Sequence, residues 1–190
     1  MPEESKIITK EELKRYARQL YLIGREGQDK LKRAKILIAG AGGLGSPIAT
    51  YLAFAGVGRI VIVDNDTVEM SNLNRQTLHW SSDVGRKKTT SAQEKIRAMN
   101  PYIEVETISD TIEEATVAGI VGDADLIIDA LDNFSARYLL NRVAVKSHIP
   151  FFHGAVRGFH GQAMVAPRPV SRADPGSGTV FGVATGLMNS

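Results

Sequence analysis

The sequence of 190 residues contains no cysteine, one tryptophan and few other aromatic residues. Without cysteine the chain cannot form a disulfide framework, a thiolate zinc site, a thioester or a persulfide, and no catalytic thiolate is available. No apolar run reaches the length of a bilayer-spanning helix, and the N-terminal stretch lacks the apolar core of a signal peptide. We therefore expect a cytoplasmic protein with no membrane partner.

The chain also lacks an excess of charge of either sign. Its 23 Lys and Arg residues nearly balance its 21 Asp and Glu residues, giving a net charge of +2, and the basic residues are spread along the sequence. A nucleic-acid partner is therefore not expected. The length is that of one domain with a substantial buried core.

Hydrophobic periodicity predicts alternating strands and helices along most of the chain. Strands are expected over 35–40, 59–65, 103–109, 125–131 and 150–158. Helices are expected over 10–23, 47–56, 86–99, 110–122 and 133–148. Regular alternation of this kind predicts an α/β fold, a doubly wound, mostly parallel, Rossmann-like sheet with five parallel strands, preceded by an N-terminal helical arm.

A glycine-rich turn follows the first predicted strand. The sequence Gly40-Ala41-Gly42-Gly43-Leu44-Gly45 opens the next helix, and Asp64 ends the second strand. Glycines in this context let the backbone approach a phosphate at the helix N-terminus, and a carboxylate at this spacing can hold ribose hydroxyls. The pattern predicts nucleotide binding.

The loop after Asp64 distinguishes between nucleotides. Asp66, Asn72 and Arg75 follow it, and the cluster Arg86-Lys87-Lys88 begins a helix soon afterwards. Cations suit a polyphosphate, whereas the first ribose of NAD needs none nearby. The alternatives are a solvated helix start for the basic cluster, and an NAD-binding oxidoreductase domain for the whole chain. Cations at a helix N-terminus are electrostatically misplaced without an anion, which favours a functional role for one of them.

Acidic residues also mark the end of the fourth predicted strand. Asp129 lies inside the apolar run and has a structural interpretation, whereas Asp132 and Asn133 follow it. Asp132 is placed to hold Mg²⁺ bound to phosphates, because Mg²⁺ uses one or two carboxylates with phosphate oxygens. Helix capping by Asp132 or Asn133 is an equally good interpretation of the spacing.

Several motifs together resemble the ThiF/MoeB/HesA family of relatives of ubiquitin-activating enzymes. They are Arg15-Tyr16-Ala17-Arg18-Gln19, GAGGLGSPIATYLAFAGVGRIVIVDNDTVEMSNLNRQ (40–76), Val84-Gly85-Arg86-Lys87-Lys88 and Asp129-Ala130-Leu131-Asp132-Asn133. The resemblance extends from about residue 10 to residue 165. It implies that the chain binds ATP and Mg²⁺. It also implies that the C-terminal carboxylate of a ubiquitin-like sulfur-carrier protein ending in Gly-Gly attacks the α-phosphate, giving an acyl-adenylate for thiamine-type or molybdopterin-type sulfur transfer.

The resemblance also assigns roles to residues. Contacts with the nucleotide are implied for Gly40, Gly42, Gly43, Gly45, Asp64, Asp66, Asn72, Arg75, Lys88, Asp132 and Asn133. Within this set Arg75 and Lys88 neutralise phosphate charge, with Lys87 a less favoured neighbour, and Asp132 binds the metal. Arg18 reaches the phosphates of a partner subunit, which implies a homodimer. The expected catalytic residues are thus Arg18, Arg75, Lys88 and Asp132.

The sequence departs from the family pattern after residue 165. Family members continue through a crossover segment with two C-x-x-C pairs that bind zinc, whereas this chain has no cysteine, so no zinc is expected. His153 and His160 alone make a poor zinc site, and we interpret them as a strand and a surface histidine. We expect an arm (1–34), an adenylation domain (35–165) and a remnant of the C-terminal region (166–190). Activity impaired by C-terminal truncation is therefore expected, and a non-catalytic dimerising or carrier-binding module is a third hypothesis.

Overall fold

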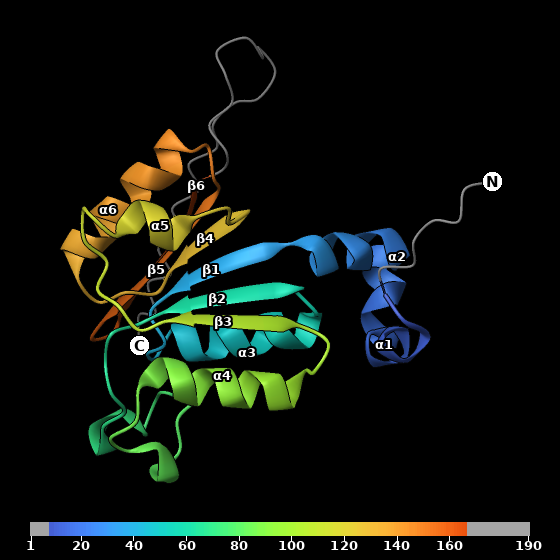
Figure 1. Cartoon of the computed structure of the whole chain (residues 1–190), viewed down its shortest axis with the longest axis horizontal. Coiled ribbons are helices and arrows are strands. Elements are labelled where there is room, and N and C mark those ends of the chain that lie inside the picture. Colours follow the sequence, from blue (N-terminus) through green and yellow to red (C-terminus); the bar gives the residue numbers. More distant parts are fainter. Residues whose placement is uncertain (1–7, 167–190) are drawn as a thin grey trace.

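The centre of the fold is a six-stranded sheet in a computed structural model that describes residues 8–166 (Figure 1). Its strands are β1 (Lys35–Ala39), β2 (Arg59–Val63), β3 (Glu104–Ile108), β4 (Leu126–Asp129), β5 (Phe151–Arg157) and β6 (His160–Ala166). They lie in the order β3-β2-β1-β4-β5-β6. The first five are parallel, and β6 pairs with β5 in the antiparallel sense.

Helices cover both faces of the sheet, as Figure 1 shows. On one face lie α3 (Gly45–Ala55) and α4 (Lys88–Met99), and on the other α5 (Val117–Val121) and α6 (Phe134–Lys146). Each face has its own apolar cluster. The central strands β1 and β4 therefore need apolar side chains on both sides, which explains their nearly continuous apolar runs. Two 3₁₀ helices, η1 (Met70–Asn72) and η2 (Ser81–Asp83), lie between β2 and α4.

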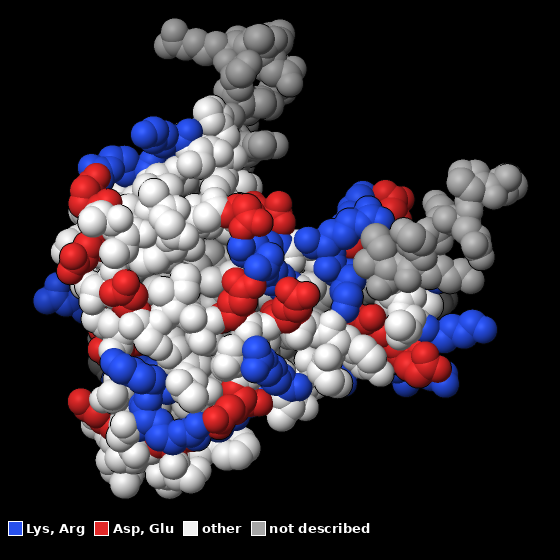
Figure 2. All heavy atoms as spheres, viewed as in Figure 1, with Lys and Arg blue, Asp and Glu red and all other residues white. Residues whose placement is uncertain are grey.

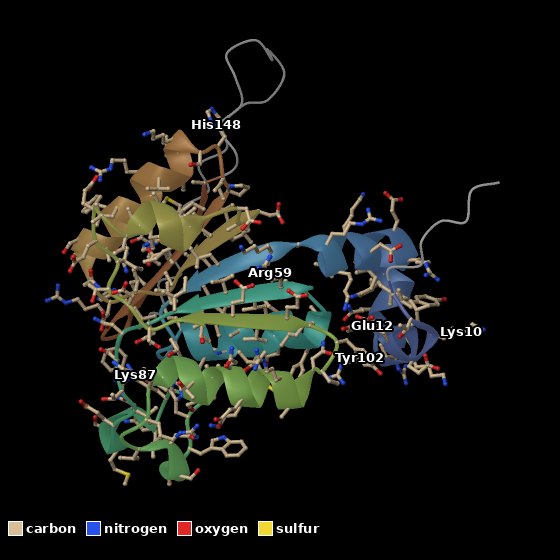
Figure 3. All side chains as sticks on the ribbon, viewed as in Figure 1. Lys10, Glu12, Arg59, Lys87, Tyr102 and His148 are labelled. Carbon is tan, nitrogen blue, oxygen red and sulfur yellow. The ribbon has the colours of Figure 1, made fainter. Side chains whose placement is uncertain are left out.

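The N-terminal arm consists of α1 (Lys10–Arg15) and α2 (Ala17–Arg33). Thr9 caps α1, and α2 is kinked at Gly24, whose φ is 66°. The Lys32 ammonium donates to Glu12 Oε1 at 2.8 Å and to the Tyr102 carbonyl. Figure 3 shows Glu12 and Tyr102 at the junction between the arm and the sheet, so this lysine fastens the arm to the domain.

The predicted α/β class and the mostly parallel, Rossmann-like sheet are confirmed. Two expected elements differ, and one strand was not expected. The expected helix over 10–23 is interrupted at Tyr16, whose side chain is buried and whose hydroxyl accepts a hydrogen bond from Asn100. The helix expected over 110–122 shrinks to α5, because the Thr116 side chain bonds the backbone of Thr111 and Glu113 and competes with helix formation. The hairpin strand β6, which follows Gly158 at φ 60°, was not predicted.

The surface of the described residues carries mixed charge. Figure 2 shows basic and acidic side chains interspersed on one face, with an uncharged area between them. No helix within residues 8–166 has the length and apolar character needed to cross a membrane. Within the same residues, no group of three or more His, Cys, Asp or Glu side chains is arranged to hold a metal ion. The predicted C-terminal remnant (166–190) lies almost wholly outside the described residues.

Candidate functional site

The glycine loop joins β1 to the first turn of α3, and its glycines differ in what they require. A Cβ at Gly40, where φ is 98°, would lie 2.8 Å from the Ala130 carbonyl oxygen. A Cβ at Gly45 would lie 1.8 Å from the Gly40 carbonyl oxygen, which is an impossible contact. At Gly42 and Gly43 the nearest atoms belong to the side chains of Gln76 and Arg75, each at 3.6 Å. The outer glycines therefore shape the turn, while the inner two face polar side chains of the following loop.

The inner part of the loop is a place for an anion. Within the described residues, no acceptor takes a hydrogen bond from the Gly42 or Gly43 N–H group. These groups precede the first turn of α3, a helix of 11 residues whose N-terminus carries partial positive charge. Free N–H groups and a helix N-terminus together favour phosphate at this position.

Asp64, directly after β2, binds the backbone of the glycine loop through its carboxylate. Its Oδ2 accepts from the Ala41 N–H at 2.8 Å, and its Oδ1 accepts from the Asp66 N–H at 2.8 Å. Each carboxylate oxygen keeps a further lone pair that a ribose hydroxyl could use. The predicted ribose contact is therefore compatible with the geometry, and the structure adds a second role, the fixing of the loop backbone.

Lys88, the first residue of α4, differs from its basic neighbours. Its side chain is 7% exposed, and its ammonium binds Asp66 Oδ2 at 2.7 Å. Asp66 is 62% exposed, so the lysine is held close to the loop by a carboxylate that remains open to solvent. Arg86 instead pairs with Asp83 at 2.9 Å and with Glu94 at 2.5 Å. Among residues 8–166, the exposed Lys87 ammonium donates only to the Asn65 carbonyl, at 2.8 Å. The solvated interpretation therefore fits Lys87 and not Lys88.

The loop around η1 presents one exposed cation. Arg75 is exposed, and its Nη1 donates to the Ser71 carbonyl at 3.0 Å and to Asn74 Oδ1 at 2.9 Å. The rest of its guanidinium is available to a ligand beside Gly43. Asn72 is buried, and its Oδ1 accepts from the Glu69 N–H at 3.1 Å. Its observed role is thus to cap η1, a role that the sequence had not indicated.

Two acidic residues at the end of β4 differ in burial and in hydrogen bonding. Asp129 is fully buried and accepts hydrogen bonds from the Leu131 N–H, from Arg137 at 2.8 Å and from His153 at 2.7 Å. The structural interpretation of Asp129 is therefore confirmed, as is that of His153 as a strand histidine. Asp132 is exposed and makes no hydrogen bond or ion pair with the other described residues.

Asn133, the neighbour of Asp132, forms the cap of α6. Its Oδ1 accepts from the Ala136 N–H at 3.0 Å. Capping therefore falls to Asn133 and leaves the Asp132 carboxylate open at the carboxyl ends of the strands. An unpartnered carboxylate there fits the requirements of Mg²⁺ bound to phosphates.

Arg18 lies apart from the other predicted residues. The neighbouring Gln19 donates to the carbonyl of Ala55, at the C-terminus of α3, at 2.7 Å. The glycine loop is at the opposite end of that helix, about 16 Å away by the rise of 11 residues. Arg18 itself is exposed on α2. Within one subunit the structure therefore does not bring Arg18 to the glycine loop.

Three residues that the sequence did not single out, His79, Ser91 and Lys95, are linked by hydrogen bonds to the glycine loop. His79 Nε2 is 2.9 Å from the Ala41 carbonyl oxygen, and its Nδ1 is 2.9 Å from Ser91 Oγ. Lys95 donates to the same hydroxyl at 3.0 Å. The signal was the spacing of polar residues on α4, since Lys88, Ser91 and Lys95 recur at three and four residues and so share its buried face.

Known proteins resemble this chain over most of its length. The model of the ThiF family matches residues 16–183, which is most of the chain. The chain belongs to the ThiF family. It is 45% identical over 170 residues to a sulfur carrier protein adenylyltransferase of Thermus thermophilus, covering 88% of this chain and 63% of that protein. It is 40% identical over 193 residues to the SAMP-activating enzyme E1 of Haloferax volcanii, covering 93% and 72%. The chain thus spans somewhat under two thirds of the Thermus relative's length.

Solved structures of this ThiF-family fold include complexes with nucleotides. The E. coli tRNA N6-threonylcarbamoyladenosine dehydratase TcdA, in complex with ATP, matches with a TM-score of 0.75 and 29% identity, covering 78% of this chain and 62% of that one. E. coli MccB, in a structure with AMPCPP and MccA, matches with a TM-score of 0.72 and 32% identity, covering 83% and 47%. These neighbours support nucleotide binding by the fold.

Proposed function

We propose that this ThiF-family chain uses ATP to adenylate the C-terminal glycine of a ubiquitin-like sulfur-carrier protein. A carboxylate oxygen of the carrier attacks the α-phosphorus of ATP, the bond to the bridging oxygen of the β-phosphate breaks, and pyrophosphate leaves. The products are a carrier acyl-adenylate and pyrophosphate, and no proton needs to be transferred. The names of the Thermus and Haloferax relatives support this choice of reaction and partner.

The observation that carries the proposal is the convergence of four kinds of group at one edge of the sheet. They are the free N–H groups of the glycine loop, the Asp64 carboxylate, the exposed Arg75 guanidinium and the nearly buried Lys88 ammonium. Attack by an anionic carboxylate on an anionic phosphate requires neutralisation of charge and alignment more than a base. In the proposal Arg75 and Lys88 neutralise the phosphates, and Asp64 orients the ribose.

Asp132 and its neighbour complete the site in this proposal. The exposed Asp132 carboxylate would hold Mg²⁺, and Asn133 keeps it in place by capping α6. When bound, Mg²⁺ supplies positive charge to the phosphate oxygens.

A homodimer is part of the proposal because Arg18 is too far from the glycine loop of its own subunit. Large apolar side chains also remain exposed on the two helices that meet at this end, with Tyr21 95% and Leu22 85% exposed on α2 and Tyr51 73% exposed on α3. Burial of such side chains is a common driving force for association. A second subunit packed here would bring its Arg18 to the nucleotide. We place the reaction in the cytoplasm, where ATP is available.

The experiment that tests nucleotide choice is calorimetric titration of the whole chain with Mg·ATP and, in parallel, with NAD. We expect binding of Mg·ATP that Arg75→Ala weakens at least about tenfold, because charge-assisted hydrogen bonds are lost. Arg142→Ala is the matched control, since Arg142 lies on α6 and, within the described part of the chain, pairs only with exposed Glu114. Binding of NAD but not ATP would favour the oxidoreductase alternative. Binding of ATP with no carrier adenylate detectable by mass spectrometry would favour the non-catalytic module.

A further inference from the structure

The backbone of Ala41, the second residue of the glycine loop, is fixed by side chains at its N–H group and at its carbonyl. Its N–H donates to Asp64 Oδ2 at 2.8 Å. Its carbonyl oxygen accepts from Ser46 Oγ at 3.1 Å and faces His79 Nε2 at 2.9 Å. Ala41 is 1% exposed, so these contacts are shielded from water. Because the Ala41 carbonyl and the Gly42 N–H belong to one planar peptide unit, fixing the carbonyl also fixes the direction of this N–H group and constrains the Gly43 N–H that follows.

The hydrogen bonds around His79 have a fixed direction. A carbonyl oxygen can only accept, so Nε2 must carry the proton that is donated to Ala41. Burial lowers the pKa of His79 and outweighs the hydrogen bond to the Ala41 carbonyl, which raises it. The positive charges of Lys88 and Lys95 lower the pKa further, which favours the neutral ring. In the neutral ring Nδ1 accepts, and the single proton of the Ser91 hydroxyl is donated to it at 2.9 Å rather than to the Leu78 carbonyl at 3.5 Å.

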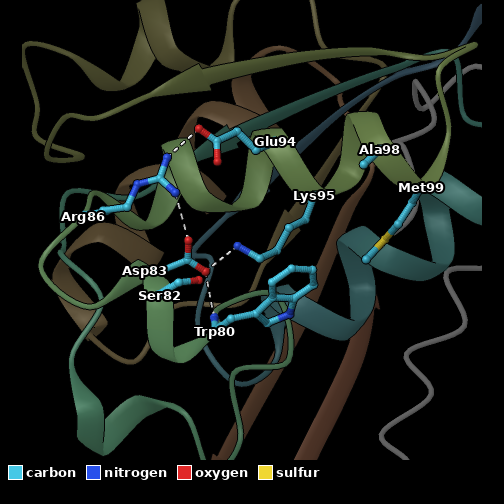
Figure 4. Close-up of a pocket in the computed structure, with 8 residues that line it drawn as sticks. All are labelled: Trp80, Ser82, Asp83, Arg86, Glu94, Lys95, Ala98 and Met99. Carbon is cyan, nitrogen blue, oxygen red and sulfur yellow. Dashed lines mark hydrogen bonds and ion pairs between the residues drawn. The ribbon is translucent and has the colours of Figure 1, made fainter.

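The Ser91 hydroxyl in turn accepts a hydrogen bond from the Lys95 ammonium, at 3.0 Å. The Lys95 ammonium is held by Asp83 and lies 4.6 Å from the centroid of the Trp80 ring (Figure 4). The result is a directional chain of donors from Lys95 to Ser91, from Ser91 to His79 and from His79 to Ala41. It links the inner face of α4 to the glycine loop. Lys88 is the first residue of α4, so this series of hydrogen bonds also fixes the distance between the glycine loop and the Lys88 ammonium.

We propose that His79 is a positioning residue for nucleotide binding, which holds the Ala41 carbonyl through Nε2–H and keeps the glycine loop in register with α4. The inference rests on the proposed nucleotide site. This role of His79 is separate from the proposed contacts to phosphate and to Mg²⁺. With 4% of its surface exposed, His79 has almost no area open to a ligand, and it acts through the loop backbone.

Two substitutions separate this role from simple core packing. His79→Gln places an amide nitrogen near the position of Nε2 and can still donate to Ala41. His79→Asn places its amide near Nδ1, so it can still accept from Ser91 but cannot reach Ala41. We expect His79→Asn to weaken Mg·ATP binding about tenfold, the usual effect of an unmade buried hydrogen bond, and His79→Gln to recover binding to within about threefold of the unsubstituted chain. Equal binding by both variants would overturn the proposal.

A second measurement needs no nucleotide. The ¹⁵N chemical shifts of the His79 ring at neutral pH should report a neutral ring protonated at Nε2. Amide hydrogen exchange at Ala41 should be faster in His79→Asn than in His79→Gln. A ring protonated at Nδ1, or exchange that is equal in the two variants, would reject the positioning role. If the unsubstituted protein fails to bind Mg·ATP while these signatures are present, the proposed function is wrong. The hydrogen bonds from Lys95 through Ser91 and His79 to Ala41 would still be confirmed.

Discussion

At the scale of single residues, the site depends on glycines with unlike surroundings. Gly45 approaches the Gly40 carbonyl so closely that any Cβ would collide with backbone, whereas a Cβ at Gly43 would only touch the flexible Arg75 side chain. We predict that Gly45→Ala lowers the free energy of unfolding by at least about 2 kcal/mol, because the backbone must shift. Gly43→Ala should change it by less than about 0.5 kcal/mol. Urea denaturation of both variants measures the difference, and similar losses would contradict the account of the loop.

The adjacent lysines at the start of α4 provide a second matched pair. We predict that Lys88→Ala weakens Mg·ATP binding by about tenfold or more, because a charge-assisted contact to phosphate is lost at a nearly buried position. Lys87→Ala should bind nearly as well as the unsubstituted chain, since Lys87 is exposed and its ammonium donates, among the described residues, only to the Asn65 carbonyl. Figure 3 labels Lys87 at the start of the helix. Calorimetry distinguishes the two, and a larger effect at Lys87 would reverse the assignment.

The residues proposed to contact the ligand are apparent in the sequence, and the residues behind them are not. The glycine spacing and the cations are what a phosphate requires, and Asp64 is the carboxylate expected for a ribose. The link from His79 to Ala41 joins positions 38 apart in the sequence and depends on packing between α4 and the loop. Asp132 and Asn133 were equal candidates for the α6 cap, and only the backbone geometry assigns it to Asn133.

At the scale of elements, α4 is stabilised by a buried ion pair with η2. Asp83 and Lys95 are 2% and 7% exposed and line a hollow of about 440 Å³ with Trp80 and Met99 (Figure 4). Burial raises the pKa of Asp83, but the hydrogen bonds from Lys95 and the Trp80 N–H outweigh it and bring the pKa from 3.8 to about 2. Because the pKa is lower in the folded state, the carboxylate stabilises the fold above about pH 4.

We predict that this stabilisation, about 2 kcal/mol, is lost as the pH falls from about 4 towards 2. Lys95→Met removes the main partner, so its free energy of unfolding should fall less than that of the unsubstituted chain between about pH 5 and about pH 3. Lys146→Met is the control, because Lys146 is exposed on α6 and forms no ion pair with another residue of 8–166. Urea denaturation at both pH values tests this. An unchanged pH dependence in Lys95→Met would show that Lys95 does not set the pKa of Asp83.

Element prediction succeeded where one face or both faces of a segment are buried. The five parallel strands and the helices α3, α4 and α6 follow from apolar periodicity, with ends displaced by a few residues. Prediction failed where side chains act on the backbone, as at Thr116 before α5, or where burial of one residue interrupts a helix, as at Tyr16. The strand β6 is largely exposed and so carries no core-facing pattern that would reveal it.

At the scale of the whole molecule, the proposed reaction requires two subunits that share each site. We predict that Arg18→Ala and Lys88→Ala each abolish carrier adenylation, and that mixing and reassociating the two proteins restores about a quarter of the original activity. Half of the random dimers are mixed, and each mixed dimer has one site with both residues intact. Adenylate formation by the mixture, followed by mass spectrometry, measures this. Two sites that are complete within single subunits would give no recovery.

The most direct test of the central claim is exchange of labelled pyrophosphate into ATP. The chain would be incubated with Mg·ATP and a ubiquitin-like carrier that ends in Gly-Gly, and separately with the same carrier lacking those two residues. The account predicts exchange only with the intact carrier, and its loss in Lys88→Ala, because exchange requires reversible formation of the acyl-adenylate. Exchange that ignores the carrier tail, or no exchange with any such carrier despite tight ATP binding, would contradict the proposed function.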